Sequence, residues 1–155
     1  VDADEIIFRR KYKRILSFFE SEKDNPVIQL KLHQFYYKPT YLWVNKEFIA
    51  PTVCRYKKQL FHYPAQWRYE GCHFSWLLTI DEMVTKLRTY AHAKDYGHLA
   101  QKEILADAIS NKKYPFNPTI DFNIREINYL DNPEFYPDNY GIFANQFEYL
   151  LNDDR

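Results

Sequence analysis

The sequence has few glycines and cysteines and no net charge. The lack of cysteine and of net charge argues against several classes of protein. Basic and acidic residues balance at 21 each, so no net positive charge favours a nucleic acid as partner. No apolar run approaches the ~18 residues that a membrane-spanning helix requires, and we expect no membrane segment in the chain. Cys54 and Cys72 are too few for a disulfide framework or a zinc site, so two buried thiols are expected.

Aromatic residues, in contrast, are abundant, with 14 Tyr and 12 Phe among 155 residues. Apolar residues make up 46% and charged residues 27%, which is the balance of a globular protein. Since no repeat or Gly/Ser linker interrupts the chain, we interpret residues 1–155 as a single domain. Tyrosine joins an apolar ring to a hydroxyl, which suits a sugar-binding cleft and a protein core equally well.

The amino-terminal half is predicted to contain one helix followed by several strands. Apolar residues recur at helical spacing over residues 8–22, and apolar and polar residues alternate over 28–32. A second strand is expected over 35–44, with a bend or an edge at Pro39. A third is expected over 51–56, and a fourth leading into Gly71 from about Gln66. The apolar face of the helix is expected to comprise Phe8, Tyr12, Ile15, Leu16 and Phe19.

The carboxy-terminal half is predicted to be mainly helical. Thr79 and Glu82 form the pattern of a capping box ahead of an apolar helical stripe. Another helix fits residues 99–109, residues 114–137 are expected to form a loop, and a last helix should begin near Asp138. Its inward residues are expected to be Phe143, Phe147, Leu150 and Leu151. This order of elements indicates an α/β or α+β domain without opening βαβ units.

An acidic motif, Asp2-Ala3-Asp4-Glu5, opens the chain. Two aspartates one residue apart can direct both carboxylates at one hard cation, and Mg²⁺ and Mn²⁺ prefer such oxygen ligands. A diphosphate can fill the remaining coordination positions. Without a metal, the same residues are an exposed acidic terminus that favours the start of the following helix.

A second candidate group lies around a histidine, in the run Gly71-Cys72-His73-Phe74-Ser75-Trp76. A histidine between apolar neighbours is either a structural residue or a metal ligand. Asp81 and Glu82 follow in the first turn of the capped helix, where they stabilise the helix dipole or provide a general base. Glu70 is the only other acid beside this run.

Together, the two motifs resemble glycosyltransferase family 17, the family of the β-1,4-mannosyl-glycoprotein N-acetylglucosaminyltransferase and its bacterial and viral relatives. The family's Asp-x-Asp-Glu-Ile motif is matched by Asp2, Asp4, Glu5 and Ile6. Its Gly-Trp-His-(Phe/Cys)-Ser-(Trp/Tyr) signature is matched by Gly71, His73, Phe74, Ser75 and Trp76. Later similarities are Lys86, Tyr90, Ala91, His92, Pro137, Asn145, Phe147, Leu150 and Leu151. Two residues depart from the pattern: Cys72 replaces a Trp, and Ile7 replaces a Pro.

The resemblance implies an α/β fold of the GT-A type, with a mixed sheet and flanking helices. In such folds the strands before the acidic motif hold the nucleotide base and ribose. The similarity begins at the motif itself. We therefore expect the chain to be the carboxy-terminal part of a larger catalytic domain, which need not be active by itself.

The resemblance also implies the ligands of the site. Asp2, Asp4 and His73 would hold Mn²⁺ or Mg²⁺ on the diphosphate of a nucleotide-sugar donor, most simply a UDP-sugar. The residues expected to bind the donor are Asp2, Asp4, Glu5, Gly71 and Trp76. Because Cys72 replaces the family's Trp, the sugar contact of that Trp is left open.

The implied reaction is an inverting transfer of a sugar, such as N-acetylglucosamine, to a glycan acceptor. An enzyme carboxylate would remove the proton from the acceptor hydroxyl. We favour Asp81, because Glu82 is the capping partner of the helix and its carboxylate is already engaged. Glu70 is the remaining candidate.

Two other functions remain open on these residues. One is a metal-dependent phosphoesterase that uses Asp2, Asp4, Glu5 and His73 on a phosphate ester. The other is a non-catalytic carbohydrate- or protein-binding module that relies on its aromatic residues. The compartment depends on the source: the cytoplasm for a bacterial or viral member, and the Golgi lumen for a eukaryotic member with an upstream anchor.

Overall fold

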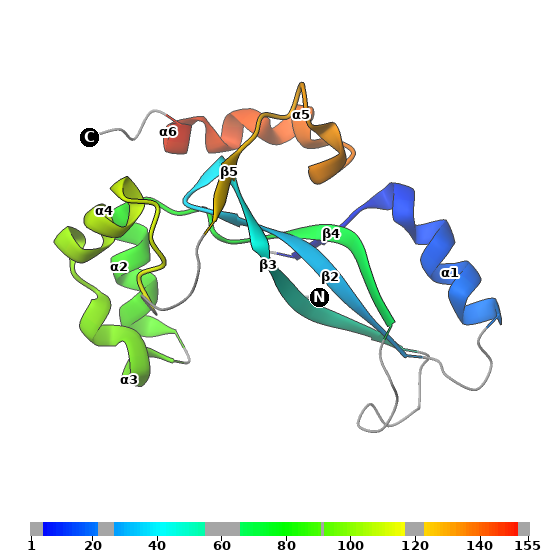
Figure 1. Cartoon of the computed structure of the whole chain (residues 1–155), viewed down its shortest axis with the longest axis horizontal. Coiled ribbons are helices and arrows are strands. Elements are labelled where there is room, and N and C mark those ends of the chain that lie inside the picture. Colours follow the sequence, from blue (N-terminus) through cyan, green and yellow to red (C-terminus); the bar gives the residue numbers. More distant parts are fainter. Residues whose placement is uncertain (1–4, 22–26, 55–65, 91, 117–122, 152–155) are drawn as a thin grey trace.

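A five-stranded mixed sheet forms the centre of the protein, and helices surround it (Figure 1). The computed structural model describes residues 5–21, 27–54, 66–90, 92–116 and 123–151. The strands are β1 (Glu5–Ile7), β2 (Val27–Tyr36), β3 (Lys38–Cys54), β4 (Gln66–Trp76) and β5 (Ile124–Glu126). Their order in the sheet is β1-β4-β2-β3-β5, with β4 parallel to β2 and the other neighbours antiparallel. The predicted α/β class is confirmed.

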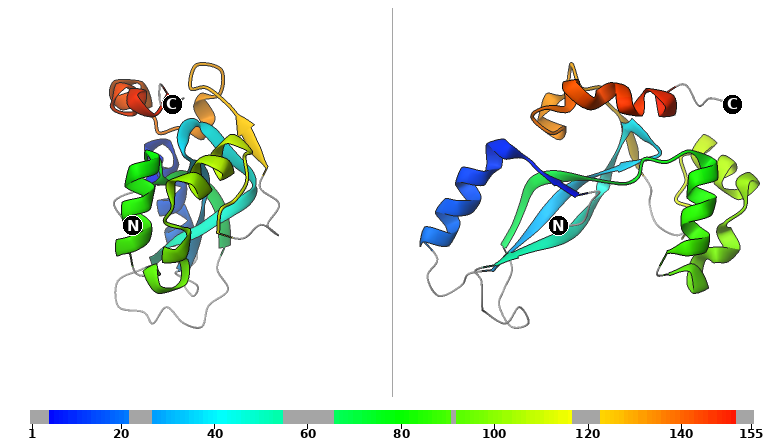
Figure 2. Two further views of the ribbon diagram at one scale, coloured as in Figure 1. Left: turned by 90° about the vertical axis from the view of Figure 1, so that its left-hand side faces the viewer. Right: turned by 180° about the vertical axis from the view of Figure 1, so that it is seen from behind.

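Helices lie at both ends of the sheet and along one side of it (Figures 1 and 2). At one end is α1 (Tyr12–Ser21), which follows the 3-10 turn η1 (Arg9–Lys11). The other end carries α2 (Ile80–Thr89), α3 (Ala93–Tyr96), η2 (Gly97–Leu99) and α4 (Lys102–Ser110). The carboxy-terminal part consists of η3 (Pro133–Phe135), α5 (Tyr140–Phe143), η4 (Ala144–Phe147) and α6 (Glu148–Leu151). None of the helices in the described ranges is long and apolar enough to cross a membrane.

Each helical group buries its own apolar cluster against the sheet. Ile15 of α1 packs on β2, and the α2–α4 group packs around Tyr36 at the end of that strand. The carboxy-terminal part packs through Tyr136 and Leu150 on the face that carries Phe35. Many of the described aromatic residues therefore pack in these cores, which is one of the two roles considered for them.

The aromatic stretch predicted as one strand with a bend or an edge at Pro39 is instead a hairpin, whose turn lies at Tyr37. Tyr37 adopts a φ of 64°, and its neighbours Tyr36 and Lys38 pair directly across the turn. A positive φ disfavours a bulky residue, but Tyr37 is buried in the cluster with α2, and this packing offsets the strain. Most of the separate strand predicted over 51–56 is the end of β3, which runs on to Cys54.

The first helix is confirmed, but two residues of its predicted apolar face are exposed. Tyr12 is 51% and Leu16 is 61% exposed, whereas Ile15 is buried. Phe8 precedes the 3-10 turn and packs in a different cluster from Ile15. The helical spacing that began at Phe8 is therefore interrupted, which explains the shift of the buried face.

The capped helix, the helix near residues 99–109 and the strand leading into Gly71 are confirmed as α2, α4 and β4. The predicted loop, however, contains β5, which pairs with β3. Leu150 is buried as expected, but Leu151 is 41% exposed because 3-10 geometry in η4 rotates the following residues. Cys72 is fully buried. The side chains of Cys54 and Phe143 lie outside the described residues.

Candidate functional site

Gly71 allows β1 to lie directly against β4. Ile7 is paired with Gly71, and Ile6 with Cys72. A Cβ atom on Gly71 would lie 2.1 Å from the carbonyl oxygen of Ile6, which is backbone and has no rotamer by which to move away. Gly71 was predicted to contact the donor. Its contacts among the described residues give it a structural role, namely to bring the acidic strand beside the histidine strand.

This strand pairing aligns three buried polar residues across the sheet. Glu5 of β1 is the register partner of His73 of β4, and His73 is the partner of Gln34 of β2. Residues paired across neighbouring strands project from the same face. All three are buried, with exposures of 7%, 6% and 8% for Glu5, His73 and Gln34. We call Glu5, His73 and Gln34 the polar row.

The polar row lies between α1 and α2. Ile7, two residues after Glu5 and hence on the same face, packs with Ile15 of α1. On the other side, β4 ends at Trp76 and the chain enters α2 through its cap at Thr79. Along the direction of the strands, α1 therefore lies on one side of the row and α2 on the other. Figure 1 shows α1 and the α2–α4 group at opposite ends of the sheet.

Two residues of the row carry groups of the kinds that bind metal ions. Glu5 offers carboxylate oxygens and His73 an imidazole nitrogen, a donor pair that fits Mn²⁺ better than Mg²⁺. Among the described residues, no group of three or more His, Cys, Asp or Glu side chains is placed to hold a metal. Asp2 and Asp4 lie outside the described residues. Asp4 is bonded to Glu5, so it is next to the residue that faces His73.

The end of β4 is tied to α2 by a lysine. Lys86 donates from Nζ to the carbonyl oxygen of Ser75 at 2.5 Å and to its Oγ at 2.7 Å. The same ammonium lies 4.8 Å from the centre of the Trp76 ring, a cation–π distance. Trp76, predicted to bind the donor, also packs against Tyr90 and Phe116. The histidine signature and its following helix therefore form one connected unit.

The predicted capping box is confirmed, and it accounts for Glu82. The backbone N–H and the Oγ1 hydroxyl of Thr79 donate to Glu82 Oε2 at 2.8 and 2.9 Å, and Glu82 N donates back to Thr79 Oγ1. Asp81, one residue earlier, is exposed and pairs with Lys102 at 2.5 Å. An exposed pair of this kind contributes little free energy, so the carboxylate of Asp81 can exchange Lys102 for another partner.

Glu70, the remaining candidate base, is fully buried at a bulge of β4. Arg14 of α1 lies 3.6 Å from Glu70 Oε1. Within the described residues neither carboxylate oxygen has a hydrogen-bond partner. A base must be reached by the acceptor hydroxyl, which a fully buried side chain under α1 does not allow. We therefore interpret Glu70 as a residue that positions α1 on the sheet.

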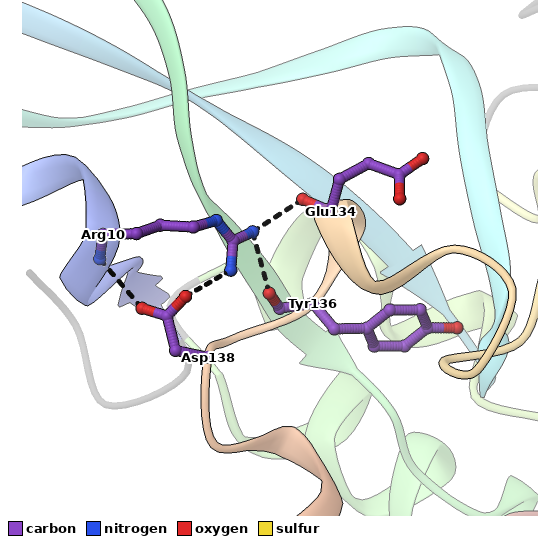
Figure 3. Close-up of polar contacts among 4 residues, drawn as sticks. All are labelled: Arg10, Glu134, Tyr136 and Asp138. Carbon is purple, nitrogen blue, oxygen red and sulfur yellow. Dashed lines mark hydrogen bonds and ion pairs between the residues drawn. The ribbon is translucent and has the colours of Figure 1, made fainter.

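The opposite face of the sheet carries a polar contact that the sequence did not reveal. Arg10 follows β1 and reaches the carboxy-terminal part, where its Nη1 donates to Asp138 Oδ1 at 2.5 Å (Figure 3). Nη2 donates to the carbonyl oxygens of Glu134 and Tyr136 at 2.7 and 3.0 Å. The backbone N–H of Arg10 donates to Asp138 Oδ2 at 2.9 Å. We call this set the Arg10 clamp; it joins the end of the acidic strand to a segment more than 120 residues away.

His33 lies beside the Arg10 clamp, between Phe8 and Phe135. Burial, with the positive charges of Arg10 and Lys11, lowers the pKa of His33 to about 4. The imidazole is therefore neutral at physiological pH, and a second positive charge beside Arg10 is avoided.

Replacing Arg10 by lysine should lower the free energy of unfolding by about 1–2 kcal/mol, because an ammonium cannot serve Asp138 and two carbonyls at once. Urea unfolding would measure this, with the exposed neighbour variant Arg9→Lys as the matched control. Burial alone would raise the pKa of Asp138, but the hydrogen bonds and charge of Arg10 outweigh it and hold the pKa below its ordinary value of 3.8.

The Asp138 carboxylate therefore adds stability above its unfolded-state pKa and loses it as pH falls through the lower folded-state pKa. In Asp138→Asn, the free energy of unfolding should therefore decrease less than in the wild type as the pH is lowered below about 4. Equal losses in Arg10→Lys and Arg9→Lys would contradict the clamp.

No protein-family model matches the chain, and neither a curated protein nor a solved structure matches it. A functional assignment therefore depends on the residues themselves. The strongest elements are the polar row, the lysine-tied end of β4 and the exposed carboxylate at the start of α2.

Proposed function

We propose that this chain belongs to a metal-dependent, inverting glycosyltransferase of the GT-A type, which moves a sugar from a nucleotide-sugar donor to a glycan acceptor. The observation that carries the proposal is the register of β1 and β4. Two motifs separated by most of the amino-terminal half meet so that Glu5 faces His73.

In the proposed mechanism, Asp2, Asp4 and His73 would hold the metal, and the metal would supply positive charge to neutralise the diphosphate of a UDP-sugar. Glu5 and Gln34 lie on either side of His73 in the sheet, where a carboxylate or amide can orient a ligating imidazole. Asp81 accepts the proton of the acceptor hydroxyl. The hydroxyl oxygen then forms a bond to the anomeric carbon as the bond to the diphosphate breaks, and the diphosphate leaves with the electron pair.

Metal and nucleotide titration of the chain tests the proposal. We expect UDP to bind in the presence of Mn²⁺ and to lose binding when the metal is chelated, as measured by calorimetry. Mg²⁺ should support weaker binding, because an imidazole ligand favours manganese. Hydrolysis of p-nitrophenyl phosphate would indicate a phosphoesterase instead. Neither hydrolysis nor metal-dependent nucleotide binding would indicate a binding module.

A further inference from the structure

The outer face of α2 carries an open pocket, of which the proposed mechanism uses only Asp81. Its volume is about 470 Å³, within the range of small-ligand sites. The residues that line it are Leu78, Asp81, Glu82, Thr85, Lys86 and Thr89. Two of these already have a place in the site: Asp81 is the proposed base, and Lys86 is bonded to Ser75 beside the histidine signature.

The polar groups of the pocket are arranged along one ridge of the helix. Asp81, Thr85 and Thr89 are four residues apart and so lie above one another. Thr85 Oγ1 donates to the carbonyl of Asp81 at 3.0 Å, and Thr89 Oγ1 to that of Thr85 at 2.9 Å. Because each hydroxyl proton is engaged with the helix, the oxygen lone pairs are directed outward as acceptors. Hydroxyl donors are the natural partners of such a ridge.

The charges of the pocket and of its ion-pair partner cancel. Asp81 and Glu82 contribute two negative charges, and Lys86 and Lys102, which pairs with Asp81, contribute two positive charges. No net charge therefore favours an anion such as phosphate or diphosphate here. A neutral ligand rich in hydroxyls can donate to the carboxylates and threonines while its apolar face contacts Leu78.

Tyr149 does not line the pocket, but it is within electrostatic reach of Glu82, which does. Tyr149 of α6 is 47% exposed, and the pKa of its phenol is raised by partial burial and then by the negative charge of Glu82. An exposed ring next to hydrogen-bonding side chains is a common setting for a sugar, because the ring covers the apolar face of the pyranose.

We propose that this pocket is the acceptor subsite, which holds a neutral saccharide with one hydroxyl at Asp81. The assignment as acceptor rests on the proposed function, whereas saccharide binding itself needs neither metal nor nucleotide. Asp81 would then have two roles: it binds the hydroxyl and removes its proton. Lys86, anchored to Ser75, would fix the distance between this subsite and the polar row.

The test is amide chemical-shift mapping of the labelled chain, without metal. The probes are two neutral disaccharides, N,N′-diacetylchitobiose and mannobiose, and inorganic diphosphate for comparison. A disaccharide should shift the amides of α2, and diphosphate should not. Thr85→Val and Thr89→Val keep side-chain shape but remove an acceptor, so each should weaken binding about 3- to 10-fold. Ser17→Ala, on the exposed side of α1, is the control and should leave binding unchanged.

Three results would overturn the inference: shifts of α2 by diphosphate alone, saccharide shifts confined to other elements, or no saccharide shift at all. The wild-type map is decisive even if a variant fails to fold. The test is also separate from that of the proposed function. Saccharide binding at α2 without Mn²⁺-dependent binding of UDP would retain the subsite and reject the transferase.

Discussion

Gly71→Ala should lower the free energy of unfolding by about 3 kcal/mol, the upper end of the usual range for overpacking. The added methyl group would lie 2.1 Å from the carbonyl oxygen of Ile6 and 3.0 Å from Leu32 Cδ2. The leucine can rotate, but the carbonyl belongs to a paired strand. Relief therefore requires β1 to move away from β4, which breaks the pairing of Ile6 with Cys72 and of Ile7 with residue 71.

Gly97→Ala is the matched control for this prediction. A methyl group at Gly97 would meet only the carbonyl oxygen of Leu87, at 3.8 Å, an ordinary van der Waals contact. The backbone of Gly97 has a helical φ of −61°, so alanine is compatible there and should be neutral or slightly stabilising. Thermal or urea unfolding of the two variants gives the comparison. A stability loss at Gly71 no larger than that at Gly97 would refute the close approach of β1.

Gly71→Ala should also affect ligand binding. If β1 leaves β4, Glu5 no longer faces His73, and metal-dependent binding should be lost together with stability. At the proposed acceptor subsite the outcome should differ, because α2 is held by its own cap and by the cluster around Met83 and Leu87. Saccharide binding at α2 should therefore survive in the folded fraction of Gly71→Ala.

Local sequence patterns predicted those elements whose structure depends on residues close together in the chain. The capping box of Thr79 and Glu82 involves residues three apart, and the start of α2 was predicted correctly. The strand leading into Gly71 was also predicted correctly, as β4 (Gln66–Trp76). Both elements frame the candidate site, so much of its setting could be predicted.

The remaining features depend on contacts between distant residues. β5 has only three residues and exists by pairing with β3, so nothing in its own sequence marks it as a strand. Arg10 lies in a basic stretch from which no pattern singles it out, and its partner Asp138 is 128 positions away. The sequence did not indicate that Gln34 lies beside His73, because this depends on the register of β2 and β4. The turn at Tyr37 was missed because no glycine marks it.

His73→Gln should reduce Mn²⁺-dependent affinity for UDP by about 100-fold or more, because it replaces a proposed ligand rather than a supporting residue. Glutamine keeps a polar side chain of similar length, which matters because His73 is only 6% exposed and alanine would leave a cavity. The nitrogen lone pair that binds manganese is lost, since the amide nitrogen of glutamine carries none. Calorimetric titration of Mn²⁺ and UDP gives the affinity directly.

A thermal shift separates the ligand role of His73 from a structural one. A ligand present at 100 times its Kd stabilises the folded state by about 2.7 kcal/mol, so Mn²⁺ with UDP should raise the Tm of the wild type. That increase should disappear in His73→Gln and persist in His98→Gln, whose histidine is exposed in η2. Glu5→Gln should diminish it if the carboxylate supports the ring of His73. If His73→Gln lowers the Tm but retains the full response to Mn²⁺, then His73 is a buried structural residue and the polar row binds no metal.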